Sequence, residues 1–463
     1  METHKLDVLP YKMIRINGDT ITPISIFKNL TGDKKFLLES SFEHEKKGKY
    51  SYIGTDPYKE LIGDNKQTIV KDLINHTEHT HTQHALQYMR DHFPKVDIDL
   101  PLPFTGGAIG YIGYDAIRSF VHIGSDLEDT LHMPDVHLMF YQNIIIYEHM
   151  SETAYLLAMN VDDTSEEQLD RRLENMKNML RPHADVTTIE TPPLQFKSDM
   201  SAEAFKDKVR KAKTYIHAGD TEQIVISKRM KANIDGDPLS YYRRLRIANP
   251  SPYMFYVDFA DYLIIGASPE SLVQTTGDYV VTNPIAGTRA RGKSDAEDQA
   301  LIKELLADEK ELSEHDMLVE LSKKDLSTIC EPASINVPTY KKVEMYEHVM
   351  HIVSEVHGRL KKGLTSMDAL IACLPAGTVS GAPKLRAMQI INELEPCKRG
   401  FYAGGIGYIG FNHDLNMALA IRSLIIKDHV AYLQTGAGIV ADSDPDAEFA
   451  ETLHKARSLM EVK

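Results

Sequence analysis

The order of strand-like and helical segments is the feature that most constrains the fold of this chain. Strand-like segments in the first half follow one another with few helices between them, at residues 36–38, 50–53, 108–114 and 138–147. In the second half, helical patterns are mixed with strand-like segments at residues 223–227, 253–259 and 262–267. A parallel sheet needs a crossover, usually helical, between successive strands, and no regular alternation of that kind is present. The sequence therefore predicts an α+β fold with substantial antiparallel sheet.

A proline-rich stretch marks the best candidate for a domain boundary. The polar helical segment 165–180 leads into residues 181–200, which contain three prolines. We predict an N-terminal part at residues 1–195 and a C-terminal part at residues 196–463. In the second part, a long acidic helix is expected from about residue 296 to residue 321.

A glycine-rich loop at residues 375–384 runs directly into a helical pattern. One face of that helix is apolar, at Leu385, Met388, Ile391 and Leu394. Pro383 stands where the first turn of a helix tolerates proline. A loop of this kind exposes backbone N–H groups at a helix N-terminus, where a carboxylate or phosphate can bind. It lacks the Gly-Lys-Ser/Thr ending of a P-loop, and a tight junction without a ligand explains it equally well.

The net charge of −15 limits what the chain can bind. Nucleic acid and anionic membrane surfaces attract basic proteins, so we expect neither as a partner. An anionic substrate would need a local cluster of cations or a metal ion. No run reaches the ~18 apolar residues of a membrane helix, and residues 1–15 lack the apolar core of a signal peptide. The three cysteines have no C-x-x-C spacing and indicate reduced thiols in the cytoplasm.

Two glycine-punctuated segments resemble each other. Residues 107–115 read GAIGYIGYD and residues 405–412 read GIGYIGFN, which contains a literal G-x-G-x-x-G. A dinucleotide site would need a helix after the last glycine, whereas residues 412–414 look like a turn. We interpret both segments as strands that pack closely against their neighbours, and we set NAD aside. A histidine-rich, threonine-rich stretch is interpreted as solvated surface rather than a metal site, at His76, His79, His81 and His84.

Two pairs of glutamates are spaced by three residues on expected helices. Glu311 with Glu314, and Glu448 with Glu451, would each lie on one helix face. Four carboxylates from two helices would suit Mg²⁺, which binds carboxylates, waters and a substrate oxygen. Two solvated acidic faces are the alternative.

Three further polar side chains lie in the same C-terminal third, Tyr402, Arg422 and Lys455. Arg422 follows an apolar triplet at residues 419–421, which suggests a partly enclosed guanidinium on a strand. An enclosed arginine needs a partner, and either a substrate carboxylate or an internal salt bridge would serve.

Several long motifs in the same order make the chain similar to the chorismate-utilising enzymes, and within them to the large subunits of anthranilate synthases. These motifs lie at residues 284–289, 314–319, 375–384, 436–438 and 448–455. The similarity spans roughly residues 36–458 and is densest after residue 280. It implies two facing antiparallel sheets with outer helices, in which an N-terminal regulatory part and a C-terminal catalytic part share one body.

The resemblance also implies roles for individual residues. Mg²⁺ on the ring carboxylate of chorismate would be held by Glu314 and Glu451, helped by Glu311 and Glu448. The carboxylate of the enolpyruvyl arm would be held by Tyr402, Arg422 and the backbone of Gly436 and Gly438. Positive charge near the ring carboxylate would come from Lys455, and the ring would be lined by Gly287 and Thr288.

The catalytic residues implied by the resemblance are Glu270, His351, Gln223 and Thr288. Hydroxide is a poor leaving group, so an acid must protonate the C4 oxygen as ammonia adds at C2. A glutamate with a raised pKa can do this, and Glu270 would stand near that hydroxyl. His351 is the candidate for handling the C2 proton when pyruvate leaves, and a structural histidine is the alternative.

Two positions discriminate among the chorismate enzymes. Isochorismate and salicylate synthases use a lysine base where this chain has Gln223, and a neutral amide cannot deprotonate water. Many aminodeoxychorismate synthases carry a lysine nucleophile where this chain has Ala286. Direct attack by ammonia is therefore favoured, and aminodeoxychorismate synthesis stays as the alternative.

Segments of the chain match those that form the tryptophan feedback pocket of anthranilate synthases. The residues implied are Leu38, Glu39, Ser40, Lys49, Tyr50, Ser51, Pro250, Ser251, Pro252, Tyr253 and Met254. Glu39 and Ser40 could take the ammonium group, while Pro252, Tyr253 and Met254 offer an apolar slot for the indole. Ordinary strand packing is the alternative, and a catalytically silent tryptophan-binding regulator is a further function to weigh.

No Cys-His-Glu glutaminase constellation is visible in the sequence, because no cysteine lies in a Gly-x-Cys-x-Gly elbow. Ammonia from glutamine would therefore require a separate amidotransferase subunit, the second component of a hetero-oligomer. Residues 320–325 depart from the family pattern, with Lys324 where an amide is usual. Local helix contacts are expected to differ there, while the glutamates are unchanged.

Overall fold

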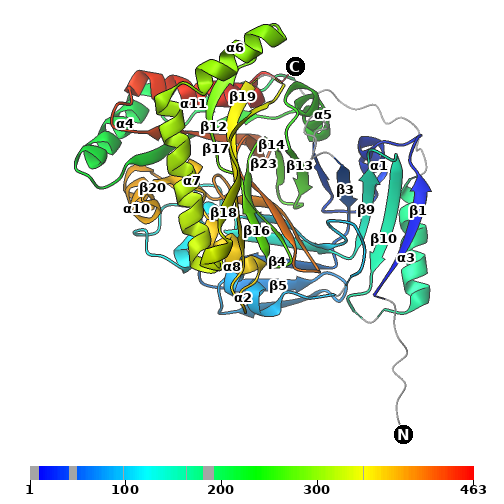
Figure 1. The fold of residues 1–463 in the computed structure, drawn as a ribbon. Coiled ribbons are helices and arrows are strands. Elements are labelled where there is room, and N and C mark those ends of the chain that lie inside the picture. The colour runs from blue at the N-terminus through cyan, green and yellow to red at the C-terminus, as the bar shows by residue number, and fades with distance from the viewer. Residues whose placement is uncertain are drawn as a thin grey trace.

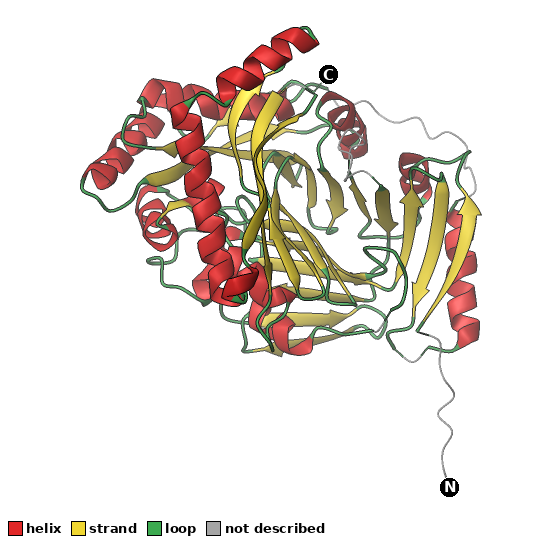
Figure 2. Cartoon of the chain, in the orientation of Figure 1, coloured by secondary structure: helices red, strands yellow, loops and turns green. Residues whose placement is uncertain are grey.

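The protein is described by a computed structural model that covers residues 10–40, 49–96, 98–162, 164–180, 192–347 and 349–462. Two large antiparallel sheets, here called sheet A and sheet B, face each other and carry helices on their outer sides (Figures 1 and 2). The α+β class and the facing sheets are as predicted.

Sheet A runs in the order β1 (Tyr11–Asn17), β10 (Thr153–Met159), β9 (Asn143–Glu148), β3 (Tyr50–Gly54), β2 (Phe36–Glu39), β13 (Tyr253–Asp258), β14 (Leu263–Ser268), β23 (Ser423–Lys427), β24 (Val430–Ile439), β12 (Gln223–Asn233) and β11 (Lys197–Ser198), with β20 (Gly381–Ala382) also paired to β12.

Sheet B runs in the order β17 (Ile285–Ala290), β19 (Val349–Arg359), β16 (Tyr279–Thr282), β15 (Ser271–Thr276), β22 (Leu415–Leu419), β21 (Gly405–Gly410), β7 (Gly107–Ile112), β8 (Val136–Tyr141), β4 (Lys59–Gly63), β5 (Thr68–Asp72) and β6 (Thr77–His81), with β18 (Asn336–Met345) also paired to β19.

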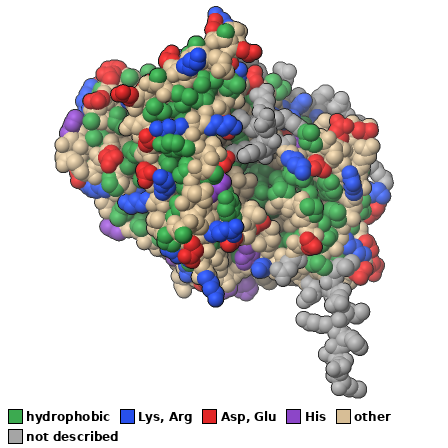
Figure 3. Space-filling view, viewed as in Figure 1, with side chains coloured by type: hydrophobic (Ala, Val, Ile, Leu, Met, Phe, Trp, Pro, Cys, Tyr) green, Lys and Arg blue, Asp and Glu red, His purple; other side chains and the backbone are tan. Residues whose placement is uncertain are grey.

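The helices are α1 (Pro23–Asn29), α2 (Ala85–His92), α3 (Glu166–Met179), α4 (Ala202–His217), α5 (Pro238–Ala248), α6 (Asp295–Leu305), α7 (Glu309–Ile329), α8 (Ser366–Cys373), α9 (Gly377–Ser380), α10 (Lys384–Leu394) and α11 (Pro445–Met460), with 3-10 turns at η1 (Tyr114–Ser119) and η2 (Pro332–Ser334). No helix in the described ranges is long and apolar enough to cross a membrane. On the face shown in Figure 3, acidic and basic side chains are interspersed.

Side chains that alternate between the two faces of the strands form two layers of hydrophobic core. In β2, Phe36 is buried in the large cluster that includes residues of both sheets, whereas Leu37 belongs to a second cluster with residues of α1, α3 and α5. Successive side chains of a strand point to opposite faces, so one strand can supply both layers. Both sheets take strands from each side of the predicted boundary, of which residues 181–191 lie outside the described part.

The two similar glycine segments form neighbouring strands. β7 and β21 pair antiparallel, with Gly110 opposite Gly407 and Gly107 opposite Gly410. A Cβ on Gly407 would lie 2.1 Å from the carbonyl oxygen of Asn416 on the adjacent strand. The prediction of closely packed strands is confirmed, because no side chain fits between these backbones.

Two predictions about helices need correction. The acidic helix expected at 296–321 is two helices, because Asp308 caps a new helix by accepting hydrogen bonds from the N–H groups of Lys310 and Glu311. In α10, Met388 and Ile391 are buried as expected, but Leu385 is 46% exposed. It lies in the first turn, where Pro383 is the residue that precedes the helix.

Candidate functional site

The side chains assigned to chorismate chemistry come from elements that meet at one end of the two sheets. Figure 1 shows α7 and α11 beside the strands β12, β17 and β19 at this end. β12 and β24 belong to sheet A, and β17 and β19 to sheet B. The site is therefore assembled from both sheets and from two helices distant in sequence.

Glu270 lies between β14 and β15 and is only 6% exposed. Its carboxylate oxygen Oε1 accepts a hydrogen bond of 2.7 Å from the Thr378 hydroxyl, which belongs to the glycine-rich loop. Burial raises the pKa of Glu270 to about 8, against the smaller opposing effects of Thr378 and the charge of Lys455. At neutral pH this carboxyl group is protonated and can act as an acid.

His351, on β19, lies opposite Thr288 on β17. Its Nδ1 is 3.0 Å from the Thr288 hydroxyl and 3.1 Å from the carbonyl oxygen of Gly287. A carbonyl oxygen only accepts, so Nδ1 carries the proton and Nε2 carries the lone pair. Burial lowers the pKa of His351 to about 4, and the charges of Arg422 and Lys455 act in the same direction. The imidazole is thus neutral and available as a base.

Gly287 sits at an irregularity in the pairing of β17 with β19, with φ of 73°. This left-handed conformation favours glycine. It also turns the Gly287 carbonyl toward His351, so the sequence of the strand sets the tautomer of the histidine.

The four glutamates lie on α7 and α11, near enough for their charges to affect one another. Burial raises the pKa of Glu314, and the charges of Glu311 and of Glu451 on the other helix raise it further. Burial likewise raises the pKa of Glu448, with an added effect of Glu451. These mutual effects mean that the two pairs share one neighbourhood, rather than forming two solvated faces.

The glutamates have the donor chemistry that Mg²⁺ requires but do not converge. Glu311 pairs with Arg289 at 3.1 Å, and Glu451 pairs with Lys455 at 2.6 Å. In the described part of the chain, no three His, Cys, Asp or Glu side chains are placed to hold a metal ion together. Oε2 of Glu448 is buried without a hydrogen-bond partner. Mg²⁺ needs only one or two carboxylates because it keeps several waters, so this donor set fits it.

Arg422 has no carboxylate among the hydrogen-bond partners of its guanidinium in the described residues. Its Nη1 donates to the carbonyl oxygen of Lys455 at 2.7 Å and to the Ser458 hydroxyl at 3.1 Å. The residue has φ of 51°, an uncommon conformation for a side chain of this size. Burial lowers the pKa of Arg422, so the surroundings leave its charge poorly compensated. A carboxylate ligand would pair with the guanidinium and compensate its charge.

Lys455, Tyr402 and the two glycines adjoin this arginine. Lys455 Nζ donates to the carbonyl oxygen of Gly436 at 3.1 Å. A Cβ on Gly436 would lie 2.8 Å from the Tyr402 hydroxyl, so only glycine lets that hydroxyl approach the strand. Burial raises the pKa of Tyr402 to about 12, which keeps the hydroxyl protonated as a donor.

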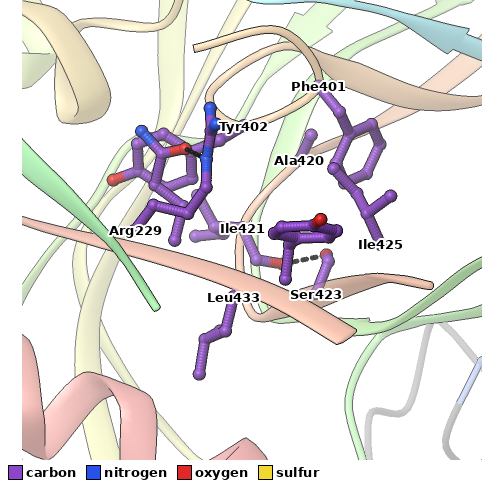
Figure 4. A pocket seen from close by; sticks show the side chains of 10 residues that line it. Arg229, Phe401, Tyr402, Ala420, Ile421, Ser423, Ile425 and Leu433 are labelled. Atoms are coloured by element: carbon purple, nitrogen blue, oxygen red, sulfur yellow. Dashed lines mark hydrogen bonds between the residues drawn. The ribbon is translucent and has the colours of Figure 1, made fainter. Parts of the chain in front are cut away.

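Figure 4 shows a small, mainly apolar cavity that also borders Tyr402. It is lined by Arg229, Phe401, Ala420, Ile421 and Ile425 among others. Its volume of about 10 Å³ is close to that needed for a single water, so it is not a site for a substrate.

Gln223 begins β12 and donates from Nε2 to Oε1 of Glu314 at 3.0 Å. A Cβ on Gly438 would lie 2.8 Å from the same Nε2, so the amide occupies the space beside that glycine. Oε1 of Gln223 is buried without a partner. The amide therefore orients a glutamate and cannot serve as a base.

A separate cavity of about 500 Å³ lies between the two sheets. Eight of the eleven residues predicted to bind tryptophan line it, Leu38, Glu39, Ser40, Lys49, Tyr50, Pro252, Tyr253 and Met254. Ser51, Pro250 and Ser251 are not on its wall. Ser51 instead turns its hydroxyl to Glu39 and His149, and the Ser251 hydroxyl bonds the carbonyl of Asn249.

Two acidic residues line this cavity, Glu39 and Glu355. Oε2 of Glu39 accepts a hydrogen bond from the Tyr242 hydroxyl at 2.8 Å and lies 3.1 Å from Nε of Arg246. Burial raises the pKa of Glu39 despite the arginine. The hydroxyl of Ser40 next to it is buried and has no hydrogen-bond partner among the described residues.

A family model for chorismate-binding enzymes matches residues 34–461. The chain belongs to the chorismate-binding enzyme family. A relative from Lactococcus lactis, an anthranilate synthase component 1, is 43% identical and is matched over 97% of this chain and 99% of its own length. A second relative of the same name, from Acetivibrio thermocellus, is 40% identical over 98% of this chain and 95% of its own length.

Solved structures agree with this membership. The crystal structure of anthranilate synthase component I from Streptococcus pneumoniae superposes with a TM-score of 0.84 at 40% identity, covering 96% of this chain and 98% of that one. The menaquinone-specific isochorismate synthase of Escherichia coli, at 19% identity and a TM-score of 0.74, covers 98% of this chain and 95% of its own and shares the fold.

Sequence reasoning missed several residues that shape these sites. Arg289 forms an ion pair with Glu311. It lies inside the motif at residues 284–289, but the sequence does not assign it this role. Thr378, which bonds Glu270, lies in the glycine-rich loop for which the sequence leaves an anion site and a tight junction equally open. Sheet B forms one wall of the larger cavity. Five residues of this wall lie on five neighbouring strands, each opposite the next in the strand pairing: Tyr408, Asn416, Gln274, Val281 and His357. Only the register of the strands brings those five together.

Proposed function

We propose that this chain is the chorismate-converting component of an anthranilate synthase, forming anthranilate and pyruvate from chorismate and ammonia. Membership of the chorismate-binding enzymes and the names of its relatives support the substrate and the product. The observation that carries the chemistry is the opposite displacement of two pKa values in one site. Glu270 is held protonated, and His351 is held neutral.

Glu270 donates the first proton. Ammonia attacks C2 of chorismate, the ring double bonds shift, and the C4–O bond breaks as the carboxyl proton of Glu270 passes to the leaving oxygen. The ammonium group formed at C2 then gives one proton to solvent. Water leaves and Glu270 becomes a carboxylate. A carboxyl group with its ordinary pKa would be ionised at neutral pH and could not perform this step.

His351 takes the second proton. The lone pair on Nε2 accepts the proton from C2 while the C3–O bond breaks and the side chain leaves as the enolate of pyruvate, which takes up a proton at its methylene carbon to give pyruvate. Aromaticity of the ring drives this elimination. The Gly287 carbonyl holds the proton on Nδ1, so the histidine presents its basic nitrogen without needing to lose a proton first.

Arg422, Tyr402 and Lys455 hold the substrate carboxylates. The guanidinium and the phenol would bind the carboxylate of the enolpyruvyl arm, with the backbone of Gly436 and Gly438 beside them. The charge of Lys455 already reaches Glu270, Glu314 and His351, which supports a place near the ring carboxylate.

Glu314 and Glu451, helped by Glu311 and Glu448, would hold Mg²⁺. When bound, the ion would neutralise the ring carboxylate and draw electron density from the ring. Its charge would also oppose the effects of burial and of the neighbouring glutamates, which raise the pKa values of Glu314 and Glu448.

Ammonia rather than water is the favoured nucleophile because an amide stands where the water-adding enzymes of this family carry a lysine base. Gln223 is an amide engaged with Glu314, and Ala286 provides no amine for covalent attack. The ammonia would come from glutamine through a separate amidotransferase subunit. The free cysteines Cys330, Cys373 and Cys397 suit a reducing cytoplasm.

The cavity between the sheets is assigned to tryptophan as a feedback inhibitor. Glu39 and Ser40 would take the ammonium group, and Tyr253 and Met254 would contact the indole. A cavity of about 500 Å³ falls in the range of small-molecule sites. In this division of labour residues 1–195 are mainly regulatory and residues 196–463 mainly catalytic, although β13 of the second part contributes to the regulatory cavity.

The test is to follow anthranilate fluorescence with chorismate, Mg²⁺ and excess ammonium salt at mildly alkaline pH, with and without tryptophan. Anthranilate formation that tryptophan suppresses is the expected result. Consumption of chorismate without anthranilate would instead indicate aminodeoxychorismate synthesis. Tryptophan binding without any turnover would indicate a silent regulator and would contradict the proposal.

A further inference from the structure

A second, much smaller cavity borders Glu270. Its wall is formed by Glu270, Ser271, Thr282, Asn283, Asp325 and Thr378 together with apolar residues. Among the described residues, none of the other side chains assigned to chorismate lies on that wall, so this space is separate from the substrate site. Its volume of about 30 Å³ is too small for a metabolite. A single water needs about 10–15 Å³, so the cavity can hold about two.

Two polar groups of this wall lack partners in the part of the chain that the structure describes. The hydroxyls of Ser271 and Thr282 are buried and make no hydrogen bond there, and both residues are less than a tenth exposed. Buried hydroxyls are normally satisfied, and an internal water is the usual partner where a polar cavity adjoins them. Two such hydroxyls in the wall of one cavity therefore indicate ordered water there.

The same cavity reaches an ion pair that contacts solvent. Asp325 lies on its wall and accepts a hydrogen bond of 2.5 Å from Lys384 Nζ. The side chains of this pair are 18% and 15% exposed. Glu270, in contrast, is only 6% exposed. The polar wall thus connects a buried acid to a partly exposed ion pair.

We infer that this cavity holds a pair of water molecules that return a proton to Glu270 from solvent through Asp325 after each turnover. The inference rests on the proposed function, because it requires Glu270 to give up a proton. When the C4–O bond breaks, the proton of Glu270 leaves in the product water and a carboxylate remains. A cavity water then transfers a proton to that carboxylate, and Asp325 passes a proton from solvent to the water. No oxidant or reductant is needed, and every electron pair stays on its oxygen.

Ser271 and Thr282 are positioning residues in this scheme, since they orient the waters and do not touch the substrate. Thr282→Val keeps the shape of the side chain and removes only the hydroxyl. We expect kcat to fall about fivefold and the solvent deuterium isotope effect on kcat to rise, with the KM for chorismate within twofold of wild type. The melting temperature should not fall, because the lost hydroxyl has no protein partner.

Thr282→Ser is the matched control, because it keeps the hydroxyl and should recover most of the rate lost in Thr282→Val. Asp325→Asn should show the same pattern as Thr282→Val, with a larger loss of kcat. Wild-type kcat and isotope effect in Thr282→Val would overturn the inference. So would a loss of melting temperature that fully accounts for the loss of activity.

A crystal structure of the protein provides a second test that does not depend on turnover. Ordered water within hydrogen-bond distance of Ser271 and Thr282 is the expected result, and a dry cavity would overturn the inference. If wild-type protein makes no anthranilate, the proposed function fails on its own, whatever the density in the cavity shows.

Discussion

The two ligand regions of this molecule differ in how completely their charged groups are paired. At the catalytic end, Arg422 bonds only a carbonyl and a hydroxyl, and oxygens of Gln223 and Glu448 are buried without hydrogen-bond partners. In the cavity between the sheets, Glu39 already has Tyr242 and Arg246. The catalytic end thus leaves room for charges that a ligand would bring, whereas Glu39 in the cavity between the sheets is already paired without one.

This difference follows from how each region is built. The cavity walls are strands in two continuous sheets, so the hydrogen-bond ladders of the sheets fix the positions of the lining side chains. The glutamates of the catalytic end lie on two helices, and Glu311 and Glu451 are held by Arg289 and Lys455 instead of by each other. A helix-borne carboxylate can leave such a partner when a stronger cation binds.

The largest effect is expected from replacing the acid of the catalytic end. Glu270→Gln keeps the size of the side chain but cannot donate the proton, so kcat should fall about 10²–10⁴-fold. The KM for chorismate should change far less, because Glu270 acts mainly in the transition state. Anthranilate fluorescence at saturating chorismate measures the change, and a loss confined to KM would contradict the assigned role.

The next effect concerns the order of the two steps. His351→Ala should slow pyruvate release by roughly 10²-fold, and amination less, since the histidine takes the C2 proton after ammonia has added. Quenched reactions separated by chromatography should show the amino intermediate accumulating. Equal slowing of both steps would assign His351 to structure rather than to proton transfer.

The buried acid also predicts how stability depends on pH. Because the pKa of folded Glu270 is near 8 and its ordinary value is 4.5, the fold favours the protonated form. That contribution is complete below about pH 4.5 and is lost as the pH rises through 8. Glu270→Gln stays neutral, so its stability relative to wild type should increase by up to about 1.4 kcal/mol per pH unit between about pH 5 and 8. Denaturant unfolding at several pH values measures this, and a constant difference would contradict the raised pKa.

The smallest effect is expected in the cavity between the sheets, where Glu39 is already paired. Ser40→Ala removes a hydroxyl that has no partner among the described residues and that would accept a hydrogen bond from the tryptophan ammonium. The tryptophan concentration for half inhibition should rise about threefold to tenfold. Ser251→Ala is the control, because that serine is not on the cavity wall and should leave the value unchanged. A similar shift in both variants would contradict a contact between Ser40 and tryptophan.

Local pattern and resemblance together predicted much of this structure. The facing antiparallel sheets agree with the sequence, as does the close pairing of the two glycine segments, while the roles of the catalytic residues stay predictions. The sequence pattern could not predict contacts between segments that are far apart along the chain. Three contacts depend on strand register and side-chain direction. They are the ion pair of Arg289 with Glu311, the hydrogen bond from Thr378 to Glu270, and the five-strand wall of the cavity that Glu39 also lines. The break at Asp308 was missed because acidic residues continue through it, although the aspartate is itself a strong capping residue.

The most direct test of the account is the pH dependence of kcat at saturating chorismate and a fixed, saturating concentration of free ammonia. Glu270 must be protonated and His351 neutral, so activity should rise with a midpoint near pH 4, stay level, and fall with a midpoint near pH 8. Activity that continues to rise between pH 8 and pH 9.5 would contradict a buried, protonated glutamate as the acid.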